Sequence, residues 1–164
     1  MNFVAIDFET ATAERKSACA VAIITVEEGQ IVDAYHQFIQ PPNNEYSWRN
    51  TQVHGMTSRD TRNSPNFAQI LPEIQKRLAG QTVVAHNESF DRSVLTRTLE
   101  HYGHDYASLN LAARWQCTMK IYKAKGFKPA KLNVLCDHFS IELKHHEALS
   151  DAKACAELFL RANQ

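Results

Sequence analysis

Residues 2–8 read NFVAIDF, an apolar run of strand character that contains Asp7, and a second carboxylate, Glu9, follows two residues after the first. Side chains at positions i and i+2 of a strand point to the same face. We therefore expect Phe8 to enter the core while Asp7 and Glu9 project together at the end of the strand. Two adjacent carboxylates raise each other's pKa unless a cation lies between them, and all-oxygen ligation suits magnesium or manganese. Taken alone, a solvated strand end explains the pattern equally well.

The segments that follow this strand predict a mixed α/β fold. Residues 18–26 (ACAVAIITV) and 31–39 (IVDAYHQFI) predict an antiparallel hairpin with Gly29 in its turn. The later segments are expected to be a polar, irregular connection at 43–64, a helix at 65–79, a strand at 81–85, a helix at 88–102 and mostly helical structure from 117 on, ending in a helix at 148–162. A meander of strands followed by alternating helices and strands indicates one α/β domain over residues 1–164.

The composition is that of an ordinary globular domain, with 44% hydrophobic and 22% charged residues in a chain of 164. Eighteen Lys and Arg balance eighteen Asp and Glu, so the formal net charge is zero. At the level of the whole chain, this balance excludes a strongly basic nucleic-acid binder and an acidic solvating tail. A net charge of zero does not exclude local clusters of positive or negative charge.

The cysteines and the N-terminal residues indicate a cytoplasmic protein with free thiols. Cys19, Cys117, Cys136 and Cys155 are far apart and form no Cys-x-x-Cys pair, which argues against a zinc ribbon or a thioredoxin-like redox site. A carboxylate at residue 7 is not typical of a signal peptide. No apolar run approaches the roughly 20 residues that a membrane-spanning helix needs.

A second candidate site segment, His86-Asn87-Glu88-Ser89-Phe90-Asp91, follows the strand expected at 81–85. Asp91 falls in the first turn of the next helix, where a negative charge complements the helix dipole. That structural role is sufficient to explain the residue. A junction between a strand and a helix is, however, also where open α/β sheets place their sites.

A third segment, His145-His146-Glu147-Ala148-Leu149-Ser150-Asp151, leads into the last helix. His146 and Asp151 are five residues apart, which on a continuous helix is about 140° of rotation. If both act at one site, His146 must therefore precede the helix proper. A histidine with an unperturbed pKa of about 6.5 is suited to general-base catalysis near neutral pH, although most single histidines are structural.

Taken together, Asp7-Phe8-Glu9-Thr10, His86-Asn87-x-x-Phe90-Asp91 and His146-x-Ala148-Leu149-x-Asp151-Ala152 resemble the three motifs of the DnaQ-like DEDDh 3′→5′ exonucleases. That family includes exonuclease X and the proofreading subunits of bacterial replicative polymerases, such as the epsilon subunit of DNA polymerase III. The resemblance covers roughly residues 2–162 and implies a ribonuclease-H-like fold, a mixed β-sheet flanked by helices. A tyrosine subtype has Tyr four residues before the last Asp, where this chain has Glu147, so the histidine subtype fits better.

The resemblance also implies the chemistry of the site. The four acidic positions of the family fall on Asp7, Glu9, Asp91 and Asp151, the ligands of two divalent ions, Mg²⁺ or Mn²⁺, and its general base falls on His146. In the implied two-metal mechanism, one ion and His146 activate a water while the second ion stabilises the leaving 3′ oxygen, which releases nucleoside monophosphates.

Further family positions lie near the 3′-terminal nucleotide. The resemblance implies that the substrate is contacted by Thr10, His54, Met56 and Asn87. Residues 53–57 are otherwise read as a plain surface turn, and Asn87 as a support of its strand–helix junction. Ala11-Thr12-Ala13 stands where many members have glycine, which affects how closely the backbone approaches the terminal sugar.

We expect the substrate to be a single-stranded or frayed 3′ end of DNA. An enzyme that trims RNA or degrades short oligoribonucleotides is the alternative within the family. A non-catalytic nucleic-acid-binding subunit is the alternative from another class, but such proteins usually lose a metal carboxylate or the base, and all five positions are filled here. We expect no membrane partner, and the chain length argues against a polymerase tether.

Residues 120–131 (KIYKAKGFKPAK) hold five lysines and no acid, with Tyr122 and Phe127 interleaved. This pattern fits a single-strand contact through phosphate attraction and base stacking, or equally a solvated helix face and loop. Assigning four of the eighteen acids to metal ions leaves eighteen positive against fourteen negative side chains. The metal-loaded chain would then be mildly basic, and we expect substrate binding at the site to require the metal.

Overall fold

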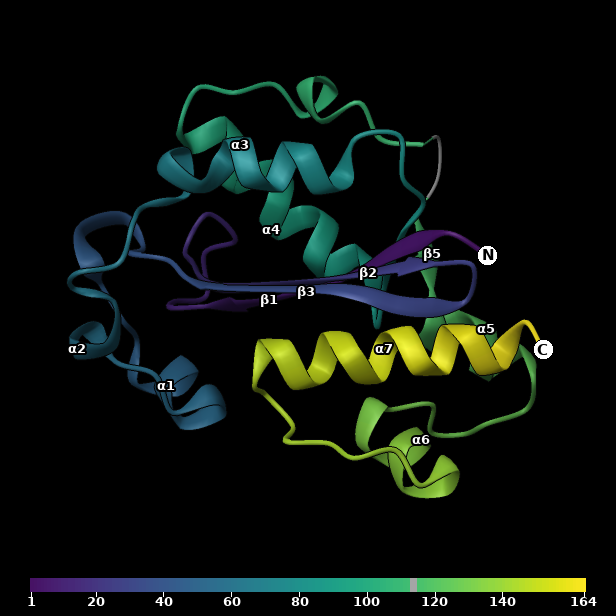
Figure 1. Ribbon diagram of the computed structural model, residues 1–164. Coiled ribbons are helices and arrows are strands. Elements are labelled where there is room, and N and C mark those ends of the chain that lie inside the picture. The colour runs from purple at the N-terminus through teal and green to yellow at the C-terminus, as the bar shows by residue number, and fades with distance from the viewer. Residues whose placement is uncertain (113–114) are drawn as a thin grey trace.

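A five-stranded mixed sheet lies at the centre of the computed structural model, which describes residues 1–112 and 115–164 (Figure 1). The strands lie side by side in the order β3-β2-β1-β4-β5. Neighbouring strands are antiparallel from β3 to β1 and parallel from β1 to β5. The bounds are β1 Phe3–Thr10, β2 Ala18–Glu27, β3 Gln30–Phe38, β4 Val83–Ala85 and β5 Gln116–Cys117. The predicted α/β class with a mixed sheet is thus confirmed.

The alternation of side chains along β1 decides where the carboxylates point. Val4, Ile6 and Phe8 pack into the core on one face of the sheet, and Phe3 and Ala5 pack on the other. Asp7 and Glu9 continue the second series, so they emerge on the opposite face from Phe8. The expectation drawn from the Asp-Phe-Glu spacing is confirmed, since Phe8 is buried in the core.

The hairpin of β2 and β3 also forms as predicted. Glu27 pairs with Gln30 across a two-residue turn in which Glu28 and Gly29 have φ angles of 50° and 81°. Positive φ at both central residues matches the right-handed twist of the paired strands, and glycine adopts it without strain.

Helices cover both faces of the sheet (Figure 1). On one face lie α3 (Phe67–Leu78) and α4 (Glu88–His101); on the other lies α7 (Ala148–Ala162), with α5 (Thr118–Ala124) and α6 (Leu132–Phe139) beside it. Ala152 and Ala156 of α7 are fully buried against the sheet, and the Phe159 ring meets Phe3 edge-on at a centroid distance of 4.8 Å. Because the alanines are small, α7 packs closely on β1 and β2 and brings Asp151 near the end of β1.

The connection at 43–64 is not irregular as predicted. It contains η1 (Pro42–Asn44), α1 (Trp48–His54) and α2 (Ser58–Thr61). These helices are too short to show apolar periodicity, but their caps are specific. The Ser47 side chain accepts a hydrogen bond from the Asn50 backbone N–H, Gly55 ends α1 in the left-handed conformation, and Thr57 and Asp60 form a capping box at α2.

The last helix spans 148–162 as predicted, and other predicted elements form with shifted ends. The helix expected at 65–79 begins at Phe67 because Asn66 and Gln69 form its capping box, and the strand expected at 81–85 begins at Val83. The 3₁₀ helix η2 (Tyr106–Leu109) and the two-residue strand β5 were not anticipated, since neither is long enough to show a pattern. No helix within the described ranges is long and apolar enough to cross a membrane.

Candidate active site

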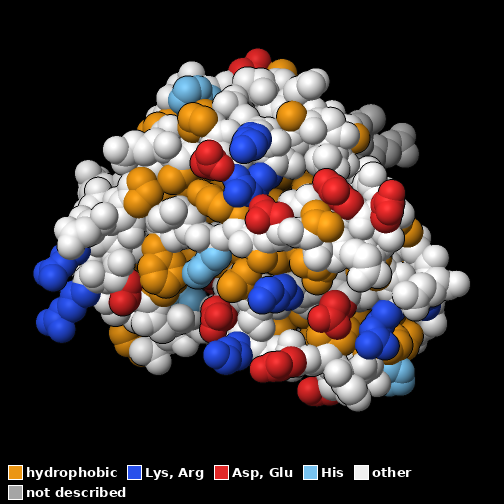
Figure 2. Space-filling model, viewed as in Figure 1, with side chains coloured by type: hydrophobic (Ala, Val, Ile, Leu, Met, Phe, Trp, Pro, Cys, Tyr) orange, Lys and Arg blue, Asp and Glu red, His pale blue; other side chains and the backbone are white. Residues whose placement is uncertain are grey.

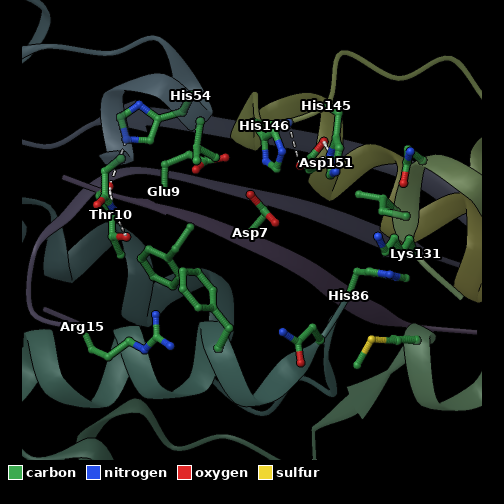
Figure 3. A pocket seen from close by; sticks show the side chains of 18 of the residues that line it. Asp7, Glu9, Thr10, Arg15, His54, His86, Lys131, His145, His146 and Asp151 are labelled. Atoms are coloured by element: carbon green, nitrogen blue, oxygen red, sulfur yellow. Dashed lines mark hydrogen bonds and ion pairs between the residues drawn. The ribbon is translucent and has the colours of Figure 1, made fainter. Parts of the chain in front are cut away.

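A cleft of about 470 Å³ opens where β1 and β4 end and α4 and α7 begin (Figure 3). Carboxyl ends of parallel strands are where open α/β sheets place their ligands. Seven of the nine residues expected at the site line this cleft: Asp7, Glu9, Thr10, His54, Asn87, His146 and Asp151. Residues more than 140 positions apart in the chain therefore meet in one place.

Three of the four expected acidic ligands form a tight group. Asp7, Glu9 and Asp151 each place a carboxylate oxygen within 4.8 Å of the others, and Glu9 and Asp151 are buried. Among the described residues, Asp91 is not a member of this group. Its Oδ1 instead accepts a hydrogen bond of 2.9 Å from the backbone N–H of Phe8, and its side chain is 1% exposed. Asp91 thus joins the first turn of α4 to β1 directly behind the cluster.

Burial and mutual repulsion oppose ionisation of these carboxylates. Burial, followed by repulsion from the nearby charges of Asp151 and Asp91, raises the pKa of Glu9 to about 8. Burial also raises the pKa of Asp91 to about 8 against the opposing effects of the Phe8 N–H and Arg15. The pKa of Asp7 is raised well above its usual range, first by burial and then by repulsion from Asp91, Glu9 and Asp151.

This donor set fits a hard divalent cation. Closely spaced carboxylate oxygens are the ligands that such ions prefer, and a cation among them removes the repulsion that raises their pKa values. Nitrogen and sulfur ligands, which would favour other metals, are absent from this particular group of three.

His146 lies before the last helix, as its spacing from Asp151 requires. It has a φ of 68°, Glu147 caps α7, and the His146 backbone N–H donates to Asp151 Oδ2 at 3.1 Å. Partial burial and the neighbouring His145 lower the pKa of His146, so the imidazole is neutral and able to accept a proton near pH 7.

The contact between His145 and Asp151 was missed by sequence reasoning. The His145 ring stacks on His146 at a centroid distance of 3.8 Å, and its Nδ1 lies 3.1 Å from Asp151 Oδ2. With His146, His145 and Asp151 form a second group of candidate metal-ligating atoms within 4.8 Å. The stacking depends on the backbone conformation ahead of α7, which the spacing of the histidines does not reveal.

Helix α1 fixes the end of β1 through Asn50, a residue that was not among the site residues predicted from the sequence. The Asn50 side-chain amide donates to the carbonyl and hydroxyl of Thr10, at 2.9 and 3.1 Å, and to the carbonyl of Thr12 at 3.0 Å. His54 Nδ1 accepts from the Met56 backbone N–H at 3.0 Å, so its Nε2 carries the proton and donates to the Thr10 carbonyl, also at 3.0 Å. These bonds hold Thr10 at the edge of the cleft.

Met56 and Asn87 occupy different surroundings. The Met56 side chain packs against the core beneath α7 and is not among the residues that line the cleft. Asn87 lines the cleft at the start of α4 with a φ of 69°, a conformation that asparagine tolerates better than most residues. Asn87 therefore both shapes the strand–helix junction and faces the cleft.

Comparison with known proteins identifies the fold and the family. Residues 4–159 match the family model described as exonuclease, RNase_T. The chain belongs to the exonuclease family. The family resemblance inferred from the three motifs is thereby confirmed, and the chain carries an exonuclease domain.

The curated relatives of this exonuclease are much longer proteins. It is 28% identical to the PolC-type DNA polymerase III of Thermotoga petrophila and 30% identical to that of Halalkalibacterium halodurans. Each alignment covers 98% of this chain but only 12% and 11%, respectively, of the polymerase.

Solved structures share the exonuclease fold over nearly the whole chain. Exonuclease X in complex with 5′-overhanging duplex DNA has a TM-score of 0.76 at 23% identity, covering 98% of this chain and 90% of that one. The nuclease domain of 3′hExo, a DEDDh member bound to rAMP, has a TM-score of 0.83 at 18% identity, covering 99% and 92%. Exonuclease I of E. coli, in complex with a dT13 oligonucleotide, reaches 0.85 at 16% identity, covering 99% and 41%.

The raised pKa of Glu9 predicts that the metal-free exonuclease loses stability as the pH rises from about 4.5 to about 8. In this window the folded chain holds a proton on Glu9 that the unfolded chain, with its ordinary value of 4.5, releases. Thermal unfolding in EDTA should show a Tm that falls by several degrees, since each kcal/mol shifts the Tm by about 2–4 °C in a chain of this size.

Glu9→Gln is the matched variant for this experiment, because it removes the titrating group and keeps the shape. Its Tm should fall less across the same pH range, and saturating Mg²⁺ should flatten the decline of the wild type. A wild-type Tm that rises with pH, or an equally steep decline in Glu9→Gln, would contradict the raised pKa.

Proposed function

We propose that this exonuclease removes nucleotides from single-stranded or frayed 3′ ends of DNA and releases nucleoside monophosphates. The observation that carries the proposal is the meeting of Asp7, Glu9 and Asp151 with the neutral His146 in one cleft at the end of β1. DNA is favoured because the curated relatives that match over nearly the whole chain are DNA polymerases, and because two of the structural neighbours hold DNA.

Asp7, Glu9, Asp91 and Asp151 would hold two divalent ions, Mg²⁺ or Mn²⁺. When bound, such ions neutralise the phosphate and lower the pKa of the attacking water. Asp7, Glu9 and Asp151 already face one another, and Asp91 is held at the end of β1 by the bond that its Oδ1 accepts from the Phe8 N–H. The carboxylate oxygens would supply the negative charge that holds the cations.

His146 acts in this proposal as the general base. Its neutral ring takes the proton from the attacking water. The backbone hydrogen bond to Asp151 holds the residue beside the carboxylates, and stacking on His145 supports the ring. The position of His146 outside α7 allows the ring to approach a bound phosphate without rotating the helix. General-base catalysis of this kind contributes about 10²–10⁴-fold to the rate.

Thr10 and Asn87 contact the substrate directly in this proposal, since both line the cleft. His54 and Met56 act largely through Thr10: the Met56 N–H sets the tautomer of His54, and His54 holds the Thr10 carbonyl. We further propose that residues 1–164 form one exonuclease domain. A cytoplasmic location is proposed from the four buried, unpaired cysteines, which suit a reducing compartment.

RNA remains the second candidate substrate, because one structural neighbour is a 3′-exonuclease that recognises a histone mRNA stem-loop and another holds rAMP. A pair of 3′-labelled oligonucleotides of identical sequence, one DNA and one RNA, distinguishes the two. With Mg²⁺ or Mn²⁺, we expect faster release of monophosphate from single-stranded DNA than from RNA, and slower release from a fully paired DNA end.

Asp7→Asn is the control for this assay. It keeps the shape of the side chain, and we expect it to abolish hydrolysis while thermal unfolding stays cooperative. Faster decay of the RNA would overturn the preference for DNA, and a wild type that degrades neither nucleic acid would refute the proposed activity.

Replacement of His146 tests its role as the base. We expect His146→Ala to lower kcat by about 10²–10⁴-fold, with partial recovery in added imidazole, because the exogenous base can enter the open cleft. The wild-type rate should fall as the pH drops through the lowered pKa of His146, since only the neutral ring accepts a proton. A rate that stays constant down to about pH 5 would remove His146 as the base.

A further inference from the structure

The lysines between positions 120 and 131 do not form one basic surface. Lys120 Nζ pairs with the buried Glu88 at 2.6 Å, and Lys125 Nζ donates to the Ala162 carbonyl at the end of α7 at 3.0 Å. Lys131 lines the active-site cleft, and its ammonium forms no ion pair with any acid of the described ranges. On the face seen in Figure 2, blue and red side chains are interspersed, so attraction for a polyanion must come from individual cations.

Lys131 lies at one end of the cleft, and Thr10 lies at the other. Figure 3 shows Lys131 beside His86, the residue that follows β4. Asp7 and Asp151 lie between them and the opposite end of the cleft at Thr10, His54 and Arg15. Lys131 also precedes α6, whose first residues line the same end of the cleft, so the positive end of the helix dipole adds to the charge of the ammonium.

The opposite end of the cleft also carries a cation, but that cation is already engaged. The Arg15 guanidinium lies 4.4 Å from the centroid of the Phe90 ring, and its charge lowers the pKa of Asp91. Thr10, the proposed contact of the terminal nucleotide, and His54, which holds the Thr10 carbonyl, lie at this same end. The two ends therefore differ: one has contacts for a nucleotide, and the other has a free ammonium.

This difference sets the direction in which the substrate strand lies in the cleft, an inference that rests on the proposed function. The scissile phosphate must lie at Asp7, Glu9 and Asp151, and the terminal nucleotide extends from it towards Thr10. The rest of the strand then leaves past His86. We propose that Lys131 binds the next phosphate of the substrate, the one on the 5′ side of the penultimate nucleotide, and so favours chains long enough to contain it.

Substrates with and without that phosphate test the proposal. The three probes are a dT10 oligonucleotide, the same oligonucleotide with one uncharged methylphosphonate at the upstream position, and the p-nitrophenyl ester of thymidine 5′-monophosphate, which contains only the terminal nucleotide. Only the first cleavage is measured, because later cleavages move the methylphosphonate into the scissile position. The matched control is Lys76→Gln, which removes the same charge from an exposed lysine of α3 that does not line the cleft.

We expect Lys131→Gln to lower kcat/KM on dT10 by about tenfold, the loss of one charge-assisted hydrogen bond. The dependence of log kcat/KM on log salt should weaken by about 0.7, the value for one phosphate of a single strand. The variant should match the wild type on the methylphosphonate oligonucleotide and on the nitrophenyl ester. Lys76→Gln should match the wild type on all three substrates.

An equal loss on the nitrophenyl ester, or no loss on dT10, would overturn the proposal. Binding to the Asp7→Asn background separates this question from catalysis. There, fluorescence anisotropy should show that adding Lys131→Gln weakens binding of dT10 but not of the methylphosphonate oligonucleotide. If the wild type hydrolyses none of the substrates, the proposed function fails, and the anisotropy result alone then supports or refutes the Lys131 contact.

Discussion

Repulsion among carboxylates buried at the end of β1 is the constraint on which the rest of the site depends. Asp7, Glu9 and Asp151 approach within 4.8 Å where burial already opposes their charges. Such a cluster is costly without a cation, and the surrounding structure holds it in place. Asp91 holds α4 against β1 through the Phe8 N–H, and His146 holds the start of α7 through Asp151.

The walls of the cleft are fixed by hydrogen bonds that leave little freedom at the reacting positions. Asn50 and His54 both bind Thr10, so α1 holds the loop that follows β1. A site held in this way does not need to reorganise when substrate arrives, which is a main source of rate enhancement in phosphoryl-transfer enzymes. The strand path inferred from Lys131 requires the same rigidity, because the two ends of the cleft must keep their distance.

Much of the fold and of the site could be predicted from regular patterns in the sequence, such as the alternation of side chains along strands and the apolar spacing along helices. The alternation around Phe8 predicted the shared face of Asp7 and Glu9, and the three motifs in order predicted a common cleft. The features that could not be predicted depend on single capping contacts or on tertiary neighbours. Helix α1 is set by Ser47 and Gly55, too few residues for a period. The stacking of His145 on His146, and the separation of Lys131 from Lys120, follow from packing between distant segments.

Counting bound Mn²⁺ by electron paramagnetic resonance tests the central claim most directly. Titration of the metal-free wild type, in the absence of nucleic acid, should show saturable binding that approaches two ions per chain. Glu9→Gln should weaken that binding by at least about tenfold, the loss of one charged ligand. Binding that does not saturate, or that is unchanged in Glu9→Gln, would contradict the claim that the carboxylate cluster exists to hold divalent ions.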